Sequence, residues 1–168
     1  SLENFISYSE LEKAFKDFTK PPHRFEFVGK VNGVNYVNDS KATNIDATLK
    51  ALIAISEMAE EADIYLICGG DLKEQDITSP NLDIIRRVKK AFIYGKDKES
   101  INKSISRYTK SKCILDLEEA VKNSKENTKK GDHVILSPAC SSLDMFKDYK
   151  DRGNKFKRLI KELNYESI

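Results

Sequence analysis

The sequence predicts an α/β domain of the Rossmann-like type, with a mostly parallel sheet flanked by helices and an antiparallel hairpin at its start. Three apolar runs, at residues 64–68, 91–94 and 134–136, are separated by segments with helical spacing. Runs without polar alternation are typical of strands buried on both faces, and their alternation with helices indicates right-handed crossovers between parallel strands. The chain has 168 residues, so residues 1–168 are expected to form a single domain.

The opening elements are a helix and the hairpin. Residues 8–18 place apolar side chains on one helical face, and a pair of prolines ends that helix. The segment 24–31 alternates apolar and polar residues, and Asn32-Gly33 is a turn signal that leads into a second strand at 34–37. These two strands form the predicted hairpin.

Two further elements complete the prediction. A weaker apolar run at residues 113–115 is interpreted as one more strand. The last helix is expected to start near Ser141 or Ser142 and to extend to Leu163, because apolar residues recur there at helical spacing. Gly153 is its weak point, since glycine is less favourable than alanine in a helix by about 1 kcal/mol.

Composition excludes several classes of function. Lys and Arg number 29 against 27 Asp and Glu, a net charge of +2, so the bulk charge requires neither nucleic acid nor an anionic membrane as a partner. The three cysteines lack CxxC spacing, which suits a reducing cytosol, and no metal site is expected. The sequence has no run long enough to span a bilayer and no signal peptide, so a cytoplasmic protein is expected. Its first residue, Ser1, hints at an excised piece.

The segment 38–44, Asn-Asp-Ser-Lys-Ala-Thr-Asn, sets a carboxylate, a cation and hydroxyls between a strand and a helix start. Free N–H groups and the helix dipole attract anions at such a position. Thr43 also fits a capping box with Asp46, so cap and ligand contact are both open for this residue. A cap does not explain Lys41, because a cation at a helix N-terminus is misplaced unless an anion joins it.

Two other strand ends carry polar side chains. Residues 69–73 read Gly-Gly-Asp-Leu-Lys, and residues 137–144 read Ser-Pro-Ala-Cys-Ser-Ser-Leu-Asp. Because the carboxyl ends of parallel strands meet at one edge of a sheet, Lys41, Lys73 and several hydroxyls are expected to converge there. Such a set suits a small ligand with carboxylates or phosphates.

Each feature also has a plainer interpretation. Lys73 can be solvated surface, and Ser141 can form a capping box with Asp144 that leaves Ser142 as the donor. Cys140 has no histidine beside it in the motif and is expected to be a packed thiol rather than a nucleophile. The sequence contains neither a Walker-type phosphate loop nor the glycine fingerprint of dinucleotide-binding proteins, so any nucleotide contact is expected to be partial.

Four motifs together resemble a known family. They are residues 22–26 (Pro-His-Arg-Phe-Glu), residues 38–44, residues 69–71 and residues 137–144. In this order and spacing they are similar to the carboxy-terminal domain of the Mur ligases of peptidoglycan synthesis, in the branch that adds D-glutamate. The resemblance implies a bacterial, three-domain enzyme whose amino-terminal UDP-binding and central ATP-binding domains are absent from this chain. Those missing domains are then its partners.

The reaction that the resemblance implies is ATP-dependent. The carboxylate of UDP-MurNAc-L-alanine is phosphorylated to an acyl phosphate, and the amine of D-glutamate attacks it. ATP and Mg²⁺ would be held mainly by the missing central domain, with neither expected on this domain alone, which is expected to be inactive in isolation. The family positions that hold D-glutamate match Lys41, Thr43, Lys73, Ser142 and Leu143. The positions near the nucleotide match Arg24, Asp39 and Lys41, and Lys41 also has a catalytic role, because it offsets charge on the transferring phosphoryl group.

Two alternatives remain at this stage. The chain could be a non-catalytic Rossmann-like module that binds anions or regulates a partner, or the carboxy-terminal domain of a related ligase that adds another amino acid. Fusion to a domain with a Walker-type loop would distinguish a ligase from a free-standing module.

Overall fold

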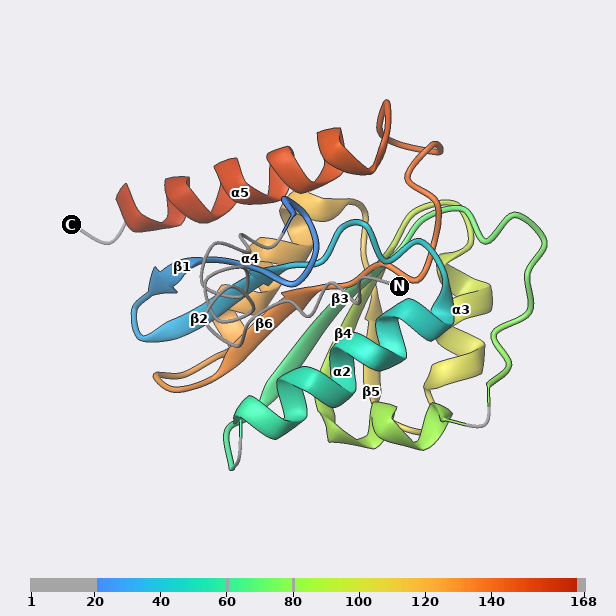
Figure 1. The fold of residues 1–168 in the computed structure, drawn as a ribbon, viewed down its shortest axis with the longest axis horizontal. Helices are drawn as coiled ribbons and strands as arrows, with labels where there is room; N and C mark the ends of the chain where they lie inside the picture. Colours follow the sequence, from blue (N-terminus) through green and yellow to red (C-terminus); the bar gives the residue numbers. More distant parts are fainter. Residues whose placement is uncertain (1–20, 60, 80, 166–168) are drawn as a thin grey trace, which may run out of the picture.

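The described residues form three layers, with helices on both faces of a central sheet (Figure 1). The structure is a computed structural model and describes residues 21–59, 61–79 and 81–165. Within them the sheet has six strands in the order β1-β2-β6-β3-β4-β5. The strands are β1 (Glu26–Val31), β2 (Val34–Asn38), β3 (Ile64–Gly69), β4 (Val88–Tyr94), β5 (Lys110–Cys113) and β6 (His133–Leu136). Only the β1–β2 pair is antiparallel, so the predicted fold class is confirmed.

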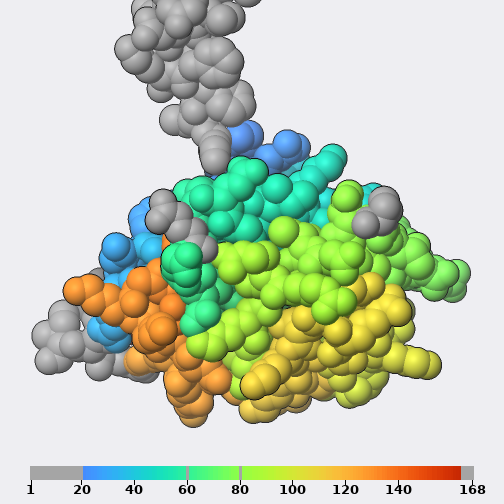
Figure 2. Space-filling model, turned by 90° about the horizontal axis from the view of Figure 1, so that it is seen from below, coloured from blue at the N-terminus to red at the C-terminus, as the bar shows by residue number. Residues whose placement is uncertain are grey.

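The helices divide between the two faces. On one face lie α2 (Ile45–Ala59), the 3₁₀ helix η1 (Leu82–Arg87) and α3 (Lys98–Ile105). On the other face lie α4 (Leu117–Asn127) and α5 (Tyr149–Tyr165). Figure 2 shows α2, in teal, beside the η1 segment, in lime, over the first face. The helix predicted over residues 8–18 lies outside the described residues.

The core confirms that the apolar runs are doubly buried strands. In β3, Leu66 packs with the α2 side of the sheet, whereas Tyr65 and Ile67 pack with the α4 and α5 side. All three side chains are at most 3% exposed. A strand with both faces covered has no solvated face, and this is why its sequence shows no polar alternation.

The hairpin turn is also confirmed. Asn32 and Gly33 both have positive φ, 51° and 81°, as a two-residue turn with left-handed central residues requires. Such a turn matches the twist of the flanking strands. It sets Val31 directly opposite Val34, and both side chains are buried.

The strand predicted at residues 113–115 is displaced. β5 ends at Cys113, and Leu115 beyond it is 73% exposed. β5 pairs only with β4 and is therefore an edge strand, where residues such as Lys110 and Lys112 can face solvent. Its sequence is therefore polar, and a prediction based on apolar residues placed this strand about three residues too late in the chain.

The start of the last helix was predicted too early. α5 begins at Tyr149, and Asp148 caps it by accepting the N–H of Asp151 at 2.8 Å. The alternative of a capping box between Ser141 and Asp144 is wrong. The Ser141 hydroxyl accepts the N–H of Leu143 at 3.4 Å, and Asp144 Oδ2 accepts the N–H of Lys96 at 2.9 Å. Residues 141–148 are therefore a loop that is tied to the end of β4.

Gly153 is not a weak point of α5 but a contact surface. The helix is continuous there, and a Cβ on Gly153 would lie 2.2 Å from His23 Nδ1. The absence of a side chain therefore allows His23 to pack against the helix.

Substitution of Gly153 by alanine is expected to destabilise the domain by about 1–3 kcal/mol, although alanine is the better helix former by about 1 kcal/mol. The clash with the buried His23 ring outweighs the gain in helix propensity. Urea unfolding of Gly153→Ala measures the effect. Asn154→Ala, at an exposed site on the same helix, serves as control and should be neutral or slightly stabilising. A Gly153→Ala variant more stable than wild type would contradict this account.

Candidate functional site

The segments that follow β3 and β6 are hydrogen-bonded to each other just beyond the carboxyl ends of these strands. The N–H of Asp71 donates to the carbonyl of Ser141 at 3.1 Å, and the N–H of Ser141 donates to the carbonyl of Asp71 at 2.9 Å. Gly70 permits this approach, since a Cβ there would lie 2.2 Å from the Ser141 carbonyl oxygen. The motif at residues 69–73 and the motif at residues 137–144 are thus joined by a pair of backbone hydrogen bonds.

A cavity of about 340 Å³, here named the Lys73 cavity, lies at this junction. It collects residues from all three strand ends that the sequence singled out. Its lining residues are Thr43, Asn44, Asp71, Leu72, Lys73, Gln75, Ser141, Ser142, Leu143, Asp148 and Tyr149.

Four of the five residues assigned to D-glutamate line the Lys73 cavity. Thr43 is exposed there because Asn44, and not Thr43, caps α2: Asn44 Oδ1 accepts the N–H of Ala47 at 2.9 Å. Of the two interpretations left open for Thr43, the capping box is therefore wrong. Lys73 is also exposed and makes no ion pair with any described residue, so its ammonium is available to an anion. Ser142 and Leu143 complete the set.

Lys41 lies in a second cavity of about 510 Å³, here named the Lys41 cavity. Arg24 and Asp39, the other two residues assigned to the nucleotide, line this same cavity. The Lys41 ammonium is 5.4 Å from the centroid of the Tyr149 ring, and Tyr149 also lines the Lys73 cavity. Tyr149 therefore lines the Lys73 cavity and also contacts Lys41, which does not itself line that cavity.

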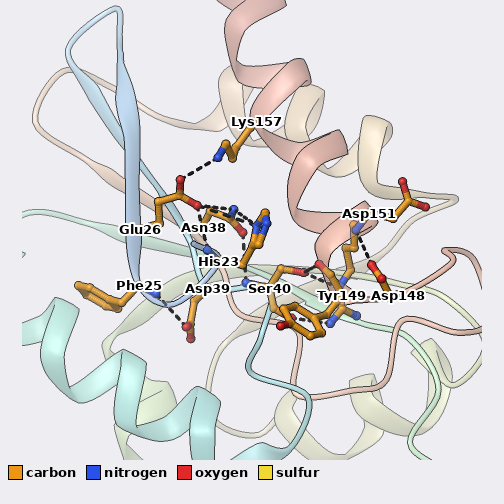
Figure 3. Close-up of polar contacts among 11 residues, drawn as sticks. His23, Phe25, Glu26, Asn38, Asp39, Ser40, Asp148, Tyr149, Asp151 and Lys157 are labelled. Carbon is orange, nitrogen blue, oxygen red and sulfur yellow. Dashed lines mark hydrogen bonds and ion pairs between the residues drawn. The ribbon is translucent and has the colours of Figure 1, made fainter. Parts of the chain in front are cut away.

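The carboxylate of Asp39 is committed to contacts within the protein. Oδ1 accepts the N–H of Phe25 at 3.0 Å, and Oδ2 accepts the hydroxyl of Ser137 at 2.8 Å (Figure 3 shows the Phe25 contact). Burial raises the pKa of Asp39, and the contacts with Ser137, Phe25 and Arg24 offset this only in part. Asp39 thus joins the start of the hairpin to the end of β6, and only 8% of it is exposed.

Comparison with known proteins decides the family. The family model of the Mur ligase, glutamate ligase domain, matches residues 23–140, well over half of the chain. The chain belongs to the Mur ligase family.

The relatives of this Mur ligase domain are considerably longer. A UDP-N-acetylmuramoylalanine–D-glutamate ligase from Caldicellulosiruptor saccharolyticus is 43% identical over 160 residues, which cover 94% of this chain and 34% of the relative. One from Protochlamydia amoebophila is 41% identical over 159 residues, with the same two coverages. The chain therefore spans about a third of the length of these relatives and corresponds to their carboxy-terminal domain.

Solved structures agree with the fold. The UDP-N-acetylmuramate–alanine ligase of Thermotoga maritima matches with a TM-score of 0.67 at 13% identity, covering 94% of this chain and 34% of that one. The FolC protein of E. coli in complex with ADP matches with a TM-score of 0.66 at 12% identity, covering 94% of this chain and 36% of that one. At such identities the match supports the shared architecture alone.

Arg152 is a part of the site region that sequence reasoning missed. It is completely buried, and its guanidinium connects the two loops that carry the site. Nε donates to the Ser40 hydroxyl at 2.9 Å, and a terminal nitrogen donates to the Ser40 carbonyl at 2.8 Å. Both terminal nitrogens donate to the Cys140 carbonyl at 3.1 Å. The signal was present in the sequence, because Arg152 falls on the same helical face as the buried Phe156 and Ile160.

The backbone of His23 holds the backbone of Lys41, and the His23 side chain is itself fixed by polar contacts with Asn38 and Glu26 (Figure 3). The side-chain amide of Asn38 donates to His23 Nδ1 at 2.9 Å, which fits a neutral ring, and also to Glu26 at 3.1 Å. The carbonyl of His23 accepts the N–H of Lys41 at 3.0 Å. Burial opposes ionisation of Glu26, but the contacts with Lys157 and with the N–H of His23 outweigh it and lower the pKa of Glu26. His23 thus has a structural role.

Stability of the Mur ligase domain is expected to fall as the pH drops below about 6.5, because both of its histidines have lowered pKa values. Burial lowers the pKa of His23 and of His133, and Glu26 and Asp132, respectively, offset this only in part. With folded pKa values below the unfolded value, the unfolded chain binds protons first. The contribution is complete above the unfolded pKa and is lost as the pH falls toward the folded pKa.

The free energy of unfolding in urea, measured between about pH 7.5 and pH 5.5, tests this expectation. His23→Asn keeps an acceptor oxygen close to the position of Nδ1 but removes the titration, so its slope against pH should be shallower than that of wild type. Equal slopes for the two proteins would contradict the role given to His23.

Proposed function

We propose that this Mur ligase domain binds D-glutamate in the Lys73 cavity and closes over ATP in the Lys41 cavity. The whole enzyme then adds D-glutamate to UDP-MurNAc-L-alanine in the bacterial cytoplasm, as a step of peptidoglycan synthesis. The observation that carries this proposal is the Lys73 cavity itself, where three separate motifs bring together the hydroxyl-bearing residues Thr43 and Ser142 and an ammonium that makes no ion pair with a described residue. The names of the relatives supply the amino acid.

The chemistry of the Lys73 cavity fits an amino acid with two carboxylates. The Lys73 ammonium supplies point-charge attraction, and the side chains of Thr43 and Ser142 supply directional hydrogen bonds. A volume of about 340 Å³ accommodates a small polar molecule. Leu143, which is 60% exposed, offers an apolar wall for the methylene groups of such a ligand.

The chemistry of the Lys41 cavity fits the phosphates of a nucleotide. Arg24 and Lys41 provide two cations, and Phe25 provides an aromatic surface beside them. The described residues contain no group of three or more His, Cys, Asp or Glu side chains that could hold a metal ion. In this proposal the ligands of Mg²⁺ are those of the central domain, as the resemblance to the Mur ligases implies. ATP, when bound, would supply the phosphoryl group that activates the carboxylate and leave as ADP, and Mg²⁺ would offset the negative charge of the phosphates.

The position of Lys41 then explains its catalytic role. Its ammonium lies 5.4 Å from the centroid of the Tyr149 ring, and Tyr149 lines the Lys73 cavity, so the ammonium can offset negative charge that develops between nucleotide and amino acid. Closure of this domain over the other two would bring both cavities to the reacting carboxylate.

None of the described helices is long and apolar enough to cross a membrane.

Phosphate release by the full-length enzyme with ATP, UDP-MurNAc-L-alanine and D-glutamate tests the proposal. Turnover should require all three, and neither L-glutamate nor meso-diaminopimelate should replace D-glutamate. This chain alone should release no phosphate. Efficient use of another amino acid would assign the domain to a different ligase, and lack of any turnover by the full-length protein would favour a non-catalytic module.

A further inference from the structure

We propose that Asp97 is a positioning residue for the amino-acid substrate, because it fixes the backbone from which Lys73 projects. This inference rests on the proposed function of the Lys73 cavity. Asp97 Oδ2 accepts the N–H of Leu72 at 2.7 Å, and the N–H of Asp97 donates to the carbonyl of Gly70 at 3.1 Å. Asp97 itself follows β4, so it ties a neighbouring strand end to the loop that carries Lys73.

The side chain of Asp97 does not cap the helix that follows it. Asp97 precedes α3, where aspartate normally caps the free N–H groups of the helix and stabilises it by about 1 kcal/mol. No such side-chain bond forms at α3. Asp116 holds the equivalent place before α4 and does cap it, accepting the N–H of Glu119 at 2.9 Å. The carboxylate of Asp97 is instead used on Leu72.

The loop that Asp97 holds is strained. Lys73 and Glu74 both have positive φ, 50° and 62°, a conformation that costs non-glycine residues about 1 kcal/mol or more each. Such a conformation persists only where surrounding contacts enforce it. The turn is closed by its own backbone bond, in which the N–H of Gln75 donates to the carbonyl of Leu72 at 3.0 Å. Two carboxylates fix its first half, because Asp97 accepts the N–H of Leu72 and Asp71 Oδ1 accepts the N–H of Lys73 at 2.8 Å.

The direction of the Lys73 side chain therefore depends on its backbone. No ion pair with a described residue holds the ammonium, and the side chain is exposed. Loss of the Leu72 contact would allow the loop to relax and the ammonium to leave the cavity. The effect should fall on binding of the amino acid and leave the nucleotide unaffected, because Lys41 and Arg24 belong to the other cavity.

Steady-state kinetics of the full-length enzyme test this role. Asp97→Ala should raise the KM for D-glutamate about tenfold while kcat and the KM for ATP stay within about twofold of wild type. Asp97→Asn retains an acceptor oxygen for the Leu72 N–H, so its KM for D-glutamate should stay within about threefold of wild type. Glu57→Ala, which removes an exposed carboxylate on α2 outside both cavities, serves as the matched control and should change nothing.

Hydrogen exchange supplies a second measurement that does not depend on the ligand. Amides of residues 71–75 should exchange faster in Asp97→Ala than in wild type, and at the wild-type rate in Asp97→Asn. An unchanged KM for D-glutamate in Asp97→Ala would overturn the inference. It would also be overturned if kcat and the melting temperature fell and the KM values for D-glutamate and for ATP rose to a similar extent, because that is the pattern of general structural damage. A wild-type enzyme that ignores D-glutamate would instead refute the proposed function, and the exchange result would still report on the Leu72 contact.

Discussion

Replacement of Lys41 by alanine in the full-length ligase is expected to lower kcat by about 10²–10³-fold, the loss typical when a preorganised group that stabilises developing charge is removed. The ammonium lies in the Lys41 cavity with Arg24 and makes no ion pair with a described residue, so its charge is not used to hold the fold. Its contact with the Tyr149 ring is worth about 0.5–1 kcal/mol at a partly exposed site. Thermal stability should therefore change little.

Phosphate release and a thermal melt of the same preparation separate the two effects. Lys50→Ala, which removes an exposed lysine from α2, has the same change in net charge and should keep full activity. Near-normal turnover in Lys41→Ala would refute the assigned role. Collapse of both activity and melting temperature would mean that Lys41 is structural.

Replacement of Arg152 by alanine is expected to lower the free energy of unfolding by about 3–5 kcal/mol, because it removes the hydrogen-bond partner of buried groups and leaves a cavity. The carbonyls of Ser40 and Cys140 would both lose their guanidinium donors. Burial lowers the pKa of Arg152, and the nearby carboxylate of Asp144 offsets this only in part.

Chemical denaturation at neutral pH measures this loss. Arg158→Ala, at an exposed site on the same helix, should change stability by no more than about 0.5 kcal/mol. A similar, small effect at Arg152 would show that the two loops are held together by other contacts. Arg152 also holds Ser40, whose hydroxyl donates to the Tyr149 carbonyl at 2.8 Å. A folded Arg152 variant should therefore bind both D-glutamate and ATP more weakly.

Local signals were sufficient for most of the fold. Strands such as β3 and β6 are buried on both faces, so their apolar runs are unambiguous, and the Asn32-Gly33 turn has a backbone that few other residue pairs adopt. The rule that ligands gather at the carboxyl ends of parallel strands also brought Thr43, Lys73 and Ser142 to one cavity.

The remaining features depend on contacts between distant parts of the chain. Nothing near Gly153 in the sequence shows that His23 packs on it, and nothing near Asp97 shows that its carboxylate reaches Leu72. Lys41 was expected in the same hollow as Lys73, but it lies in a turn at residues 40–41, closed by the Ala42 N–H and the Asp39 carbonyl, and lines the neighbouring cavity. Such placements follow from tertiary packing and not from local pattern.

The two outer strands of the sheet bear on how copies of this domain behave when crowded together. β5 is short and presents lysines, and β1 carries a register irregularity between Phe27 and Gly29. Both features make it difficult for a strand from another molecule to align and extend the sheet. Uncontrolled edge-to-edge aggregation is therefore disfavoured at either border, even though the interior strands are among the most apolar segments of the chain.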